Sequence, residues 1–258
     1  KAKLVGAMGQ EEGKDSRNGG SGKAKEGFDG SMETGSGDEI PGQKILRFKN
    51  RAAYERFLKG APAGMVLGQI DGLRAVQVRD GEWLKSMANT SEMEVGKNYY
   101  VAVPELPAEV KAMGDAFYRG VGRDAVKLMG GEGVTSDWGK GVTVALMDTS
   151  LSPKSVDLGS EEGHGIAMAS LITGGGLAQG AAPGATILEY AVLDGVGRGD
   201  SFTLAKAIYA AVDQGAKVIN MSLGSTGDSS VVRDAVAYAL SKDVALVAAT
   251  GNEAINRV

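Results

Sequence analysis

The stretch Gly141-Val-Thr-Val-Ala-Leu-Met147 is almost continuously apolar and runs directly into the carboxylate of Asp148. An apolar run without alternation is typical of a strand that is buried on both faces of a sheet. Parallel sheets that are covered by helices on both sides provide such an environment. The stretch therefore predicts a central strand of an α/β fold, with a polar group at its carboxyl end.

Strands and helices alternate after this stretch. The apolar runs predict strands over 185–193, 216–223 and 244–250, and amphipathic patterns predict helices over 202–214 and 229–242. Strands separated by helices of this length indicate a parallel sheet with helices on its faces. In such sheets the functional groups lie where the strands reach their carboxyl ends.

A smaller α+β unit is predicted upstream. Its strands are predicted over 44–49, 65–70, 73–79 and 98–103, and its helices over 51–59 and 81–88. Asn50 is a suitable N-cap for the first helix, and Asp71-Gly72 predicts a two-residue hairpin. The order β-α-β-β-α-β predicts a ferredoxin-like split βαβ domain. The domain division that follows is a disordered, glycine-rich and charged tail over 1–41, the small domain over 42–105 and the α/β region over 106–258.

Composition excludes several classes of protein and site. The formal net charge of −4 argues against binding to nucleic acid or anionic lipid through bulk charge, and no apolar run is long enough for a transmembrane helix. Cysteine is absent, which excludes disulfides and cysteine nucleophiles. A nucleotide-binding α/β protein is disfavoured because the glycine-rich run 174–180 follows a helical segment rather than a strand.

Three polar residues lie where apolar elements meet turns. Asp148 ends the first strand, His164 (the only histidine) precedes an apolar helix, and Asn252 follows the last strand. Each alone has an ordinary structural explanation, such as a turn, a helix start or a cap. Together they are an acid, a base and an amide donor at one edge of a sheet.

Four motifs in this order resemble the subtilisin-like serine protease family (peptidase S8, the subtilases). They are an aspartate motif at 144–149, a histidine motif at 163–170, a substrate-cleft strand at 218–224 and an oxyanion segment at 248–253. The resemblance implies an incomplete subtilisin-like parallel sheet with helices on both faces. The upstream unit resembles the family's propeptide, which acts as an intramolecular chaperone and inhibitor.

The resemblance also implies roles for individual residues. His164 would take the proton of a serine hydroxyl, Asp148 would orient the imidazole, and Asn252 would stabilise the oxyanion. Ser222, Leu223 and Gly224 would bind an extended peptide by strand addition. The implied function is a serine endopeptidase acting on protein or peptide substrates.

The nucleophilic serine of the family has no counterpart in this sequence. We therefore expect it on a missing or separate C-terminal segment, and we expect this chain alone to be inactive. Ser150 and Ile166 stand where the family usually has glycine and threonine, so a catalytically inactive relative that serves as a binding scaffold is the alternative.

No cofactor and no metal site are predicted. The loop 173–180 offers only Thr173 and Gln179 as ligand side chains, which is poor for calcium. The expected partners are peptide substrates, the bound propeptide-like domain and a C-terminal fragment that carries the serine, without nucleic acid or membrane. A secreted or periplasmic location is expected, although no signal peptide is visible in the sequence.

Overall fold

The computed structural model describes residues 39–87, 91–104, 126–127, 130–131, 133, 136–152, 163–175 and 178–250. The predicted tail over 1–38 and most of the segment 105–135 lie outside these ranges. The described strands are β1 (Glu39–Phe48), β2 (Val66–Ile70), β3 (Ala75–Arg79), β4 (Met93–Ala102), β5 (Thr143–Asp148), β6 (Thr186–Ala191), β7 (Arg198–Asp200), β8 (Val218–Met221) and β9 (Ala245–Ala248). The described helices are α1 (Arg51–Gly60), α2 (Glu82–Met87), α4 (His164–Thr173), α5 (Ser201–Asp213) and α6 (Ser230–Ser241).

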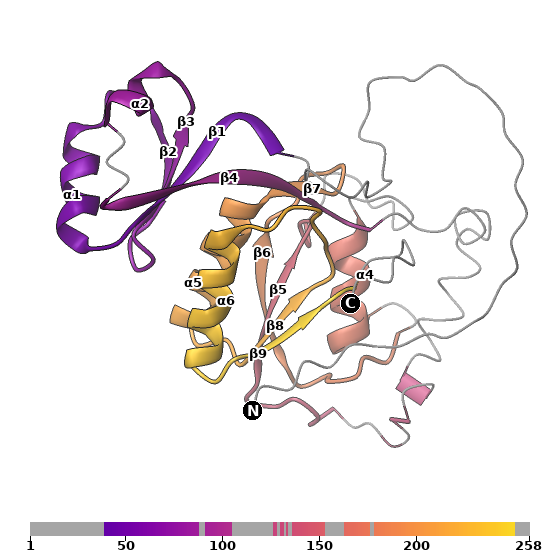
Figure 1. The fold of residues 1–258 in the computed structure, drawn as a ribbon. Coiled ribbons are helices and arrows are strands. Elements are labelled where there is room, and N and C mark those ends of the chain that lie inside the picture. The colour runs from indigo at the N-terminus through magenta and orange to yellow at the C-terminus, as the bar shows by residue number, and fades with distance from the viewer. Residues whose placement is uncertain are drawn as a thin grey trace, which may run out of the picture.

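A four-stranded parallel sheet forms the centre of the C-terminal half. Its order is β6-β5-β8-β9, and all three strand pairs are parallel. Figure 1 shows α5 and α6 on one face of this sheet and α4 on the other. Every residue from Val144 to Asp148 is buried, because β5 has neighbours on both sides and helices on both faces. The parallel sheet with helices on both faces, which the sequence predicted, is confirmed.

An antiparallel sheet in the order β2-β3-β1-β4 forms the N-terminal half. Successive residues of its strands point to opposite faces. Leu46 and Val76 enter a core with Tyr54 and Phe57 of α1, whereas Ile45 belongs to the core around α5 and the parallel sheet. The antiparallel sheet therefore has α1 and α2 on one face and the C-terminal half on the other.

Strands β1 and β4 begin earlier than the sequence suggested. β1 starts at Glu39 rather than at residue 44, so residues 39–41, assigned to the disordered tail, belong to a strand. Glu39 lies opposite Tyr99, and a register shift before Lys44 accommodates Gly42 with its φ of 72°. β4 starts at Met93 rather than at residue 98. Long-range pairing between these two strands supplies the hydrogen bonds that local sequence patterns do not reveal.

The hairpin between β2 and β3 also differs from the prediction. Ile70 pairs with Ala75, so the connection has the four residues 71–74 and not the two residues Asp71 and Gly72. Arg74 adopts a φ of 50° and its amide donates to the carbonyl of Asp71 at 3.1 Å. The amide of Phe48 donates to the carbonyl of Arg74, which holds this residue against β1 instead of β2.

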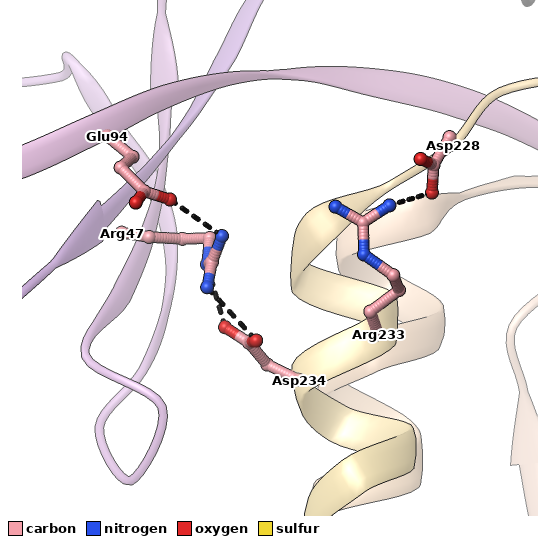
Figure 2. Close-up of polar contacts among 5 residues, drawn as sticks. All are labelled: Arg47, Glu94, Asp228, Arg233 and Asp234. Atoms are coloured by element: carbon pink, nitrogen blue, oxygen red, sulfur yellow. Dashed lines mark hydrogen bonds and ion pairs between the residues drawn. The ribbon is translucent and has the colours of Figure 1, made fainter.

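Strand β4 joins the two halves. In Figure 1 it runs from the antiparallel sheet past the ends of α5 and α6 to β7. Tyr100 lies opposite Asp200, and Ala102 exchanges two backbone hydrogen bonds of 2.9 Å with Gly224. Figure 2 shows a second connection, in which Arg47 of β1 binds both carboxylate oxygens of Asp234 on α6, at 2.7 and 3.0 Å. The two halves are therefore held together by strand pairing, apolar packing and charge.

Candidate active site

Asp148 stands at the carboxyl end of β5 and is completely buried. Its backbone is fixed on the β6 side, because its carbonyl accepts from the amides of Val192 and Leu193 at 3.0 and 3.2 Å. One side-chain oxygen, Oδ1, accepts from the amide of Thr149 at 2.7 Å. Its other oxygen, Oδ2, is buried and has no hydrogen-bond partner among the described residues.

His164 is the first residue of α4. Its Nδ1 lies 2.8 Å from Asp148 Oδ1. An ionised carboxylate can only accept, so this contact favours the imidazole tautomer with its proton on Nδ1 and leaves Nε2 free to accept a proton. The side chain of His164 keeps 23% of its surface exposed, whereas that of Asp148 has none. The pair therefore joins a buried acid to a base that solvent can reach.

Gly165 brings α4 close enough to β5 for this contact. Its amide donates to Thr149 Oγ1 at 2.9 Å, and a Cβ at this position would overlap the carbonyl oxygen of Thr149. Only glycine allows such an approach. The sequence motif around His164 thus contributes a positioning glycine as well as the imidazole.

Ser150 and Ile166, where this sequence differs from the pattern expected of the family, follow Asp148 and His164 by two residues each. Ser150 Oγ donates to Glu189 Oε1 at 2.9 Å, and the amide of Leu151 donates to the same oxygen at 2.8 Å. A carboxylate on β6 therefore anchors the turn after Asp148. Ile166 lies on the first turn of α4 and is partly buried, and its carbonyl accepts from Ser170 Oγ. The described contacts of both residues leave the Asp148–His164 hydrogen bond intact.

The predicted substrate strand over 218–224 begins with β8, and its substrate-binding residues Ser222, Leu223 and Gly224 follow directly after β8. Ser222 Oγ lies 3.0 Å from Asn220 Nδ2, and Leu223 is buried. Gly224 is paired with Ala102, so the chain's own strand already runs along this segment. The third predicted site residue, Asn252, lies outside the described residues, so its position relative to His164 is not described. The structure therefore brings Asp148 and His164 together and places an extended strand at Gly224.

Sequence reasoning missed one buried polar group near this site. Asn98 on β4 is completely buried and bonds to Ser201 and Asp200 at the start of α5. The sequence around Asn98 contains no motif that would mark it, because Asp200 and Ser201, to which it bonds, are about a hundred residues away. Within the described ranges no group of three or more histidine or acidic side chains could hold a metal ion.

The chemistry available to the pair is proton transfer. A histidine held by a carboxylate can take a proton from a nucleophile and return it to a leaving group. Low-dielectric surroundings strengthen the attraction between the carboxylate and an imidazolium that forms during the reaction.

Residues 139–257 match the family model described as the subtilase family. That region of the chain is similar to the subtilases. It contains Asp148 and His164, so the buried acid and the exposed base of this structure lie within the part that is similar to the family.

Curated relatives agree with this assignment. The chain is 38% identical to thermitase of Thermoactinomyces vulgaris over 136 residues, which cover 44% of this chain and 48% of thermitase. It is 34% identical to a subtilisin of Bacillus sp. (strain TA39) over 144 residues, which cover 44% of this chain and 34% of that protein. It is also 34% identical to the minor extracellular protease Epr of Bacillus subtilis over 134 residues, 45% of this chain and 20% of Epr. The chain thus spans half or less of these relatives.

Solved structures show the same fold. The epidermin leader peptide processing serine protease of Staphylococcus aureus is similar with a TM-score of 0.62 at 20% identity, over 85% of this chain and 62% of that one. Fervidolysin of Fervidobacterium pennivorans, a keratinolytic enzyme related to subtilisin, is similar with a TM-score of 0.57 at 23% identity, over 85% of this chain and 41% of that one. At these identities the likeness shows the fold alone.

Proposed function

We propose that this chain supplies the acid–base half of a subtilisin-type serine endopeptidase site. The observation that carries the proposal is the 2.8 Å contact between Asp148 Oδ1 and His164 Nδ1 at the carboxyl edge of the parallel sheet. In this role His164 Nε2 takes the proton of a serine hydroxyl during its attack on a peptide carbonyl. Asp148 holds the tautomer and stabilises the imidazolium, and His164 then protonates the leaving amine.

The serine is proposed to come from a further segment. No serine within the described ranges is hydrogen-bonded to His164. Ser222, which belongs to the predicted cleft strand, accepts a hydrogen bond from Asn220 instead. Asn252 is proposed as the oxyanion donor, because it follows the strand β9 that continues this edge of the sheet. The substrates are proposed to be extended peptides that pair with Ser222, Leu223 and Gly224.

The upstream domain, over 42–105, is proposed to act as an intramolecular inhibitor, with 106–258 as the N-terminal part of the catalytic domain. Two observations support this role. Residues 100–102 pair with β7 on one side and reach Gly224 on the other, where a substrate strand would lie. Arg47 adds a bidentate ion pair with Asp234. In this arrangement the protein is a zymogen, because residues 100–102 of its own chain occupy the substrate cleft.

A location outside the cytoplasm is proposed, by analogy with relatives whose names include an extracellular protease. No helix within the described residues is long and apolar enough to cross a membrane. Secretion would bring the proposed peptidase together with protein substrates in the surroundings of the cell.

The test is labelling and turnover. The 258-residue chain is incubated with a fluorophosphonate probe and a chromogenic peptide, alone and after co-expression with a candidate C-terminal segment that carries the nucleophilic serine. We expect neither labelling nor turnover alone, and both after co-expression once the domain over 42–105, which is proposed to fill the cleft, has been cleaved off and removed. Asp148→Asn should then lower kcat about 10⁴-fold, since the wrong histidine tautomer is favoured. Asp80→Asn, which changes an exposed carboxylate in the antiparallel half, is the matched control and should leave kcat unchanged.

Two results contradict the proposal. Labelling of the 258-residue chain alone would place the nucleophile among its own serines. Absence of labelling in both preparations, with a folded and associated complex, would favour the alternative of an inactive scaffold, in which the altered residues Ser150 and Ile166 accompany loss of catalysis.

A further inference from the structure

Asn98 lies where β4 passes from its pairing with β1 to its pairing with β7. The last regular pair between β1 and β4 joins Lys44 and Lys97, and the first pair between β4 and β7 joins Tyr100 and Asp200. Between them the β1 ladder is interrupted by a register shift. Beyond this shift β1 pairs with β4 only at Glu39 and Tyr99, so the segment that lies along Gly224 is held by its short ladder with β7 and not by the regular ladder with β1.

All hydrogen-bonding groups of the Asn98 amide are used. Oδ1 accepts from Ser201 Oγ at 2.8 Å and from the amide of Phe202 at 3.2 Å. Nδ2 donates to Asp200 Oδ1 at 3.1 Å and to Gln43 Oε1 at 2.9 Å. The residue is 0% exposed, so each of these groups would be buried without a partner if the strand moved.

The apolar side chains of β4 define its register less well than the hydrogen bonds of Asn98 do. Val101 is buried and Val103 is partly buried, and they are two residues apart. Side chains in a strand alternate with period two, so a shift by two residues would place Val103 where Val101 lies. Pro104 opposes that shift weakly, because it would take the place of Ala102, whose amide donates to Gly224, and proline has no amide hydrogen.

We propose that Asn98 fixes the register of residues 99–104 against β7 and Gly224, and so decides which residues lie in the cleft. The directional bonds of a buried amide distinguish one register from the next, which apolar contacts and a repetitive ladder do not. The importance of the cleft rests on the proposed function. The register itself is a property of this chain, whether or not it belongs to a peptidase.

Engineered cysteine pairs measure the register, because the sequence contains no cysteine. Ala102→Cys with Arg198→Cys joins residues that are opposite each other in β4 and β7. Pro104→Cys with Arg198→Cys reports the shifted register and at the same time removes the proline. With Asn98 present, we expect the first pair to cross-link about tenfold faster than the second. With Asn98→Leu, we expect the two rates to become similar, because four hydrogen bonds no longer favour one register.

The controls separate register from general stability. Asn50→Ala removes another structural asparagine, the N-cap of α1, and should leave the ratio of rates unchanged. Should Asn98→Leu not fold, as judged by circular dichroism, Ser201→Ala removes one partner of Asn98 and should give an intermediate ratio. An unchanged ratio in the folded Asn98→Leu or in Ser201→Ala, or an equal change in Asn50→Ala, would overturn the proposal. None of these readouts depends on peptidase activity, so either proposal can fail alone.

Discussion

The two sheets of this protein differ in what lies against their faces and at their ends. The antiparallel sheet sends Leu46 and Val76 toward α1 and α2, and Ile45 toward the core that surrounds α5. The parallel sheet is covered by its own helices, and β5 ends in the buried Asp148. The first sheet thus depends on the second for cover, whereas the second places an acid and a base at its edge.

This difference separates binding from chemistry. The polar groups of the antiparallel half that reach the other half include a strand, an amide and a guanidinium: residues 100–102, Asn98 and Arg47. They suit recognition. In the parallel half the described pair Asp148–His164 suits proton transfer. Changes in the two halves should consequently have different kinds of effect.

The largest loss of stability is expected from a change at Gly165, where α4 packs most closely against the residue after Asp148. Gly165→Ala should destabilise the protein by about 3 kcal/mol, because the new Cβ overlaps the Thr149 carbonyl and α4 must move. The movement should also lengthen the Asp148–His164 contact. Urea unfolding gives the free energy of unfolding, and NMR of the only histidine gives the hydrogen-bonded Nδ1 proton, which should disappear.

The matched control lies in the antiparallel half. Gly96 has only ordinary contacts at its Cβ position, 3.5 Å to Ser230 and 3.6 Å to Ile45, so Gly96→Ala should change the free energy of unfolding by less than about 1 kcal/mol. If the two variants were equally destabilised, tight packing at Gly165 would not be what positions His164.

The proximity of Asp148 and His164 could be predicted from the sequence because the two residues are only 16 positions apart and each lies at the end of an apolar element. Asp148 ends an apolar strand and His164 begins an apolar helix, and parallel topology brings such ends to one edge. Asn98 could not be predicted, because its partners Ser201 and Phe202 lie on a helix about a hundred residues later. The role of a polar residue within a strand cannot be predicted until the residues that face it in the fold are known.

The same distinction applies to the fold. The order of strands and helices followed from apolar periodicity and from caps such as Asn50, which accepts from the amide of Ala53. The early start of β1 at Glu39 depends on pairing with Tyr99, and the four-residue hairpin depends on Arg74 bonding to Phe48. Local sequence patterns predict which helices and strands form. Where a strand begins or ends depends on the residues with which it pairs in the fold.

A smaller effect is expected where charge joins the two halves. Arg47→Ala should destabilise the protein by about 1–2 kcal/mol, because Asp234 loses two hydrogen bonds at a site where the side chains are only 25% and 35% exposed. Figure 2 offers the control: Arg233 pairs with Asp228 near the start of α6 and makes no ion pair with the other half among the described residues. Arg233→Ala should cost less than about 0.5 kcal/mol, since this pair is exposed.

Salt distinguishes the two arginines further. Added sodium chloride should weaken the exposed Arg233 pair most and the partly buried Arg47 pair less. Measured by urea unfolding at low and high salt, the penalty of Arg47→Ala should persist. If it vanished at 1 M salt, the ion pair would be an ordinary surface contact and the halves would be joined by packing and strand pairing alone.

The smallest loss of stability is expected at Glu39, which forms ion pairs with Lys44 and Lys97 in the antiparallel sheet and does not contact Asp148 or His164. Its hydrogen bond to Lys44, and then that to Lys97, hold the pKa of this carboxyl below its ordinary value of 4.5. A lowered pKa means that the folded state favours the ionised form, so the stabilisation is present above pH 4.5 and is lost as the pH falls through the lowered value. Glu39→Gln should therefore lower the free energy of unfolding by about 0.3 kcal/mol at pH 7, a value that already allows for solvent screening. Below the lowered pKa the substitution should have no effect. Glu82→Gln, which removes an almost fully exposed pair with Lys85, is the control and should leave the free energy of unfolding at pH 7 nearly unchanged. Urea unfolding of the three proteins between pH 7 and pH 3 measures this, and a cost of Glu39→Gln that stayed constant with pH would mean that the carboxylate charge does not stabilise the start of β1.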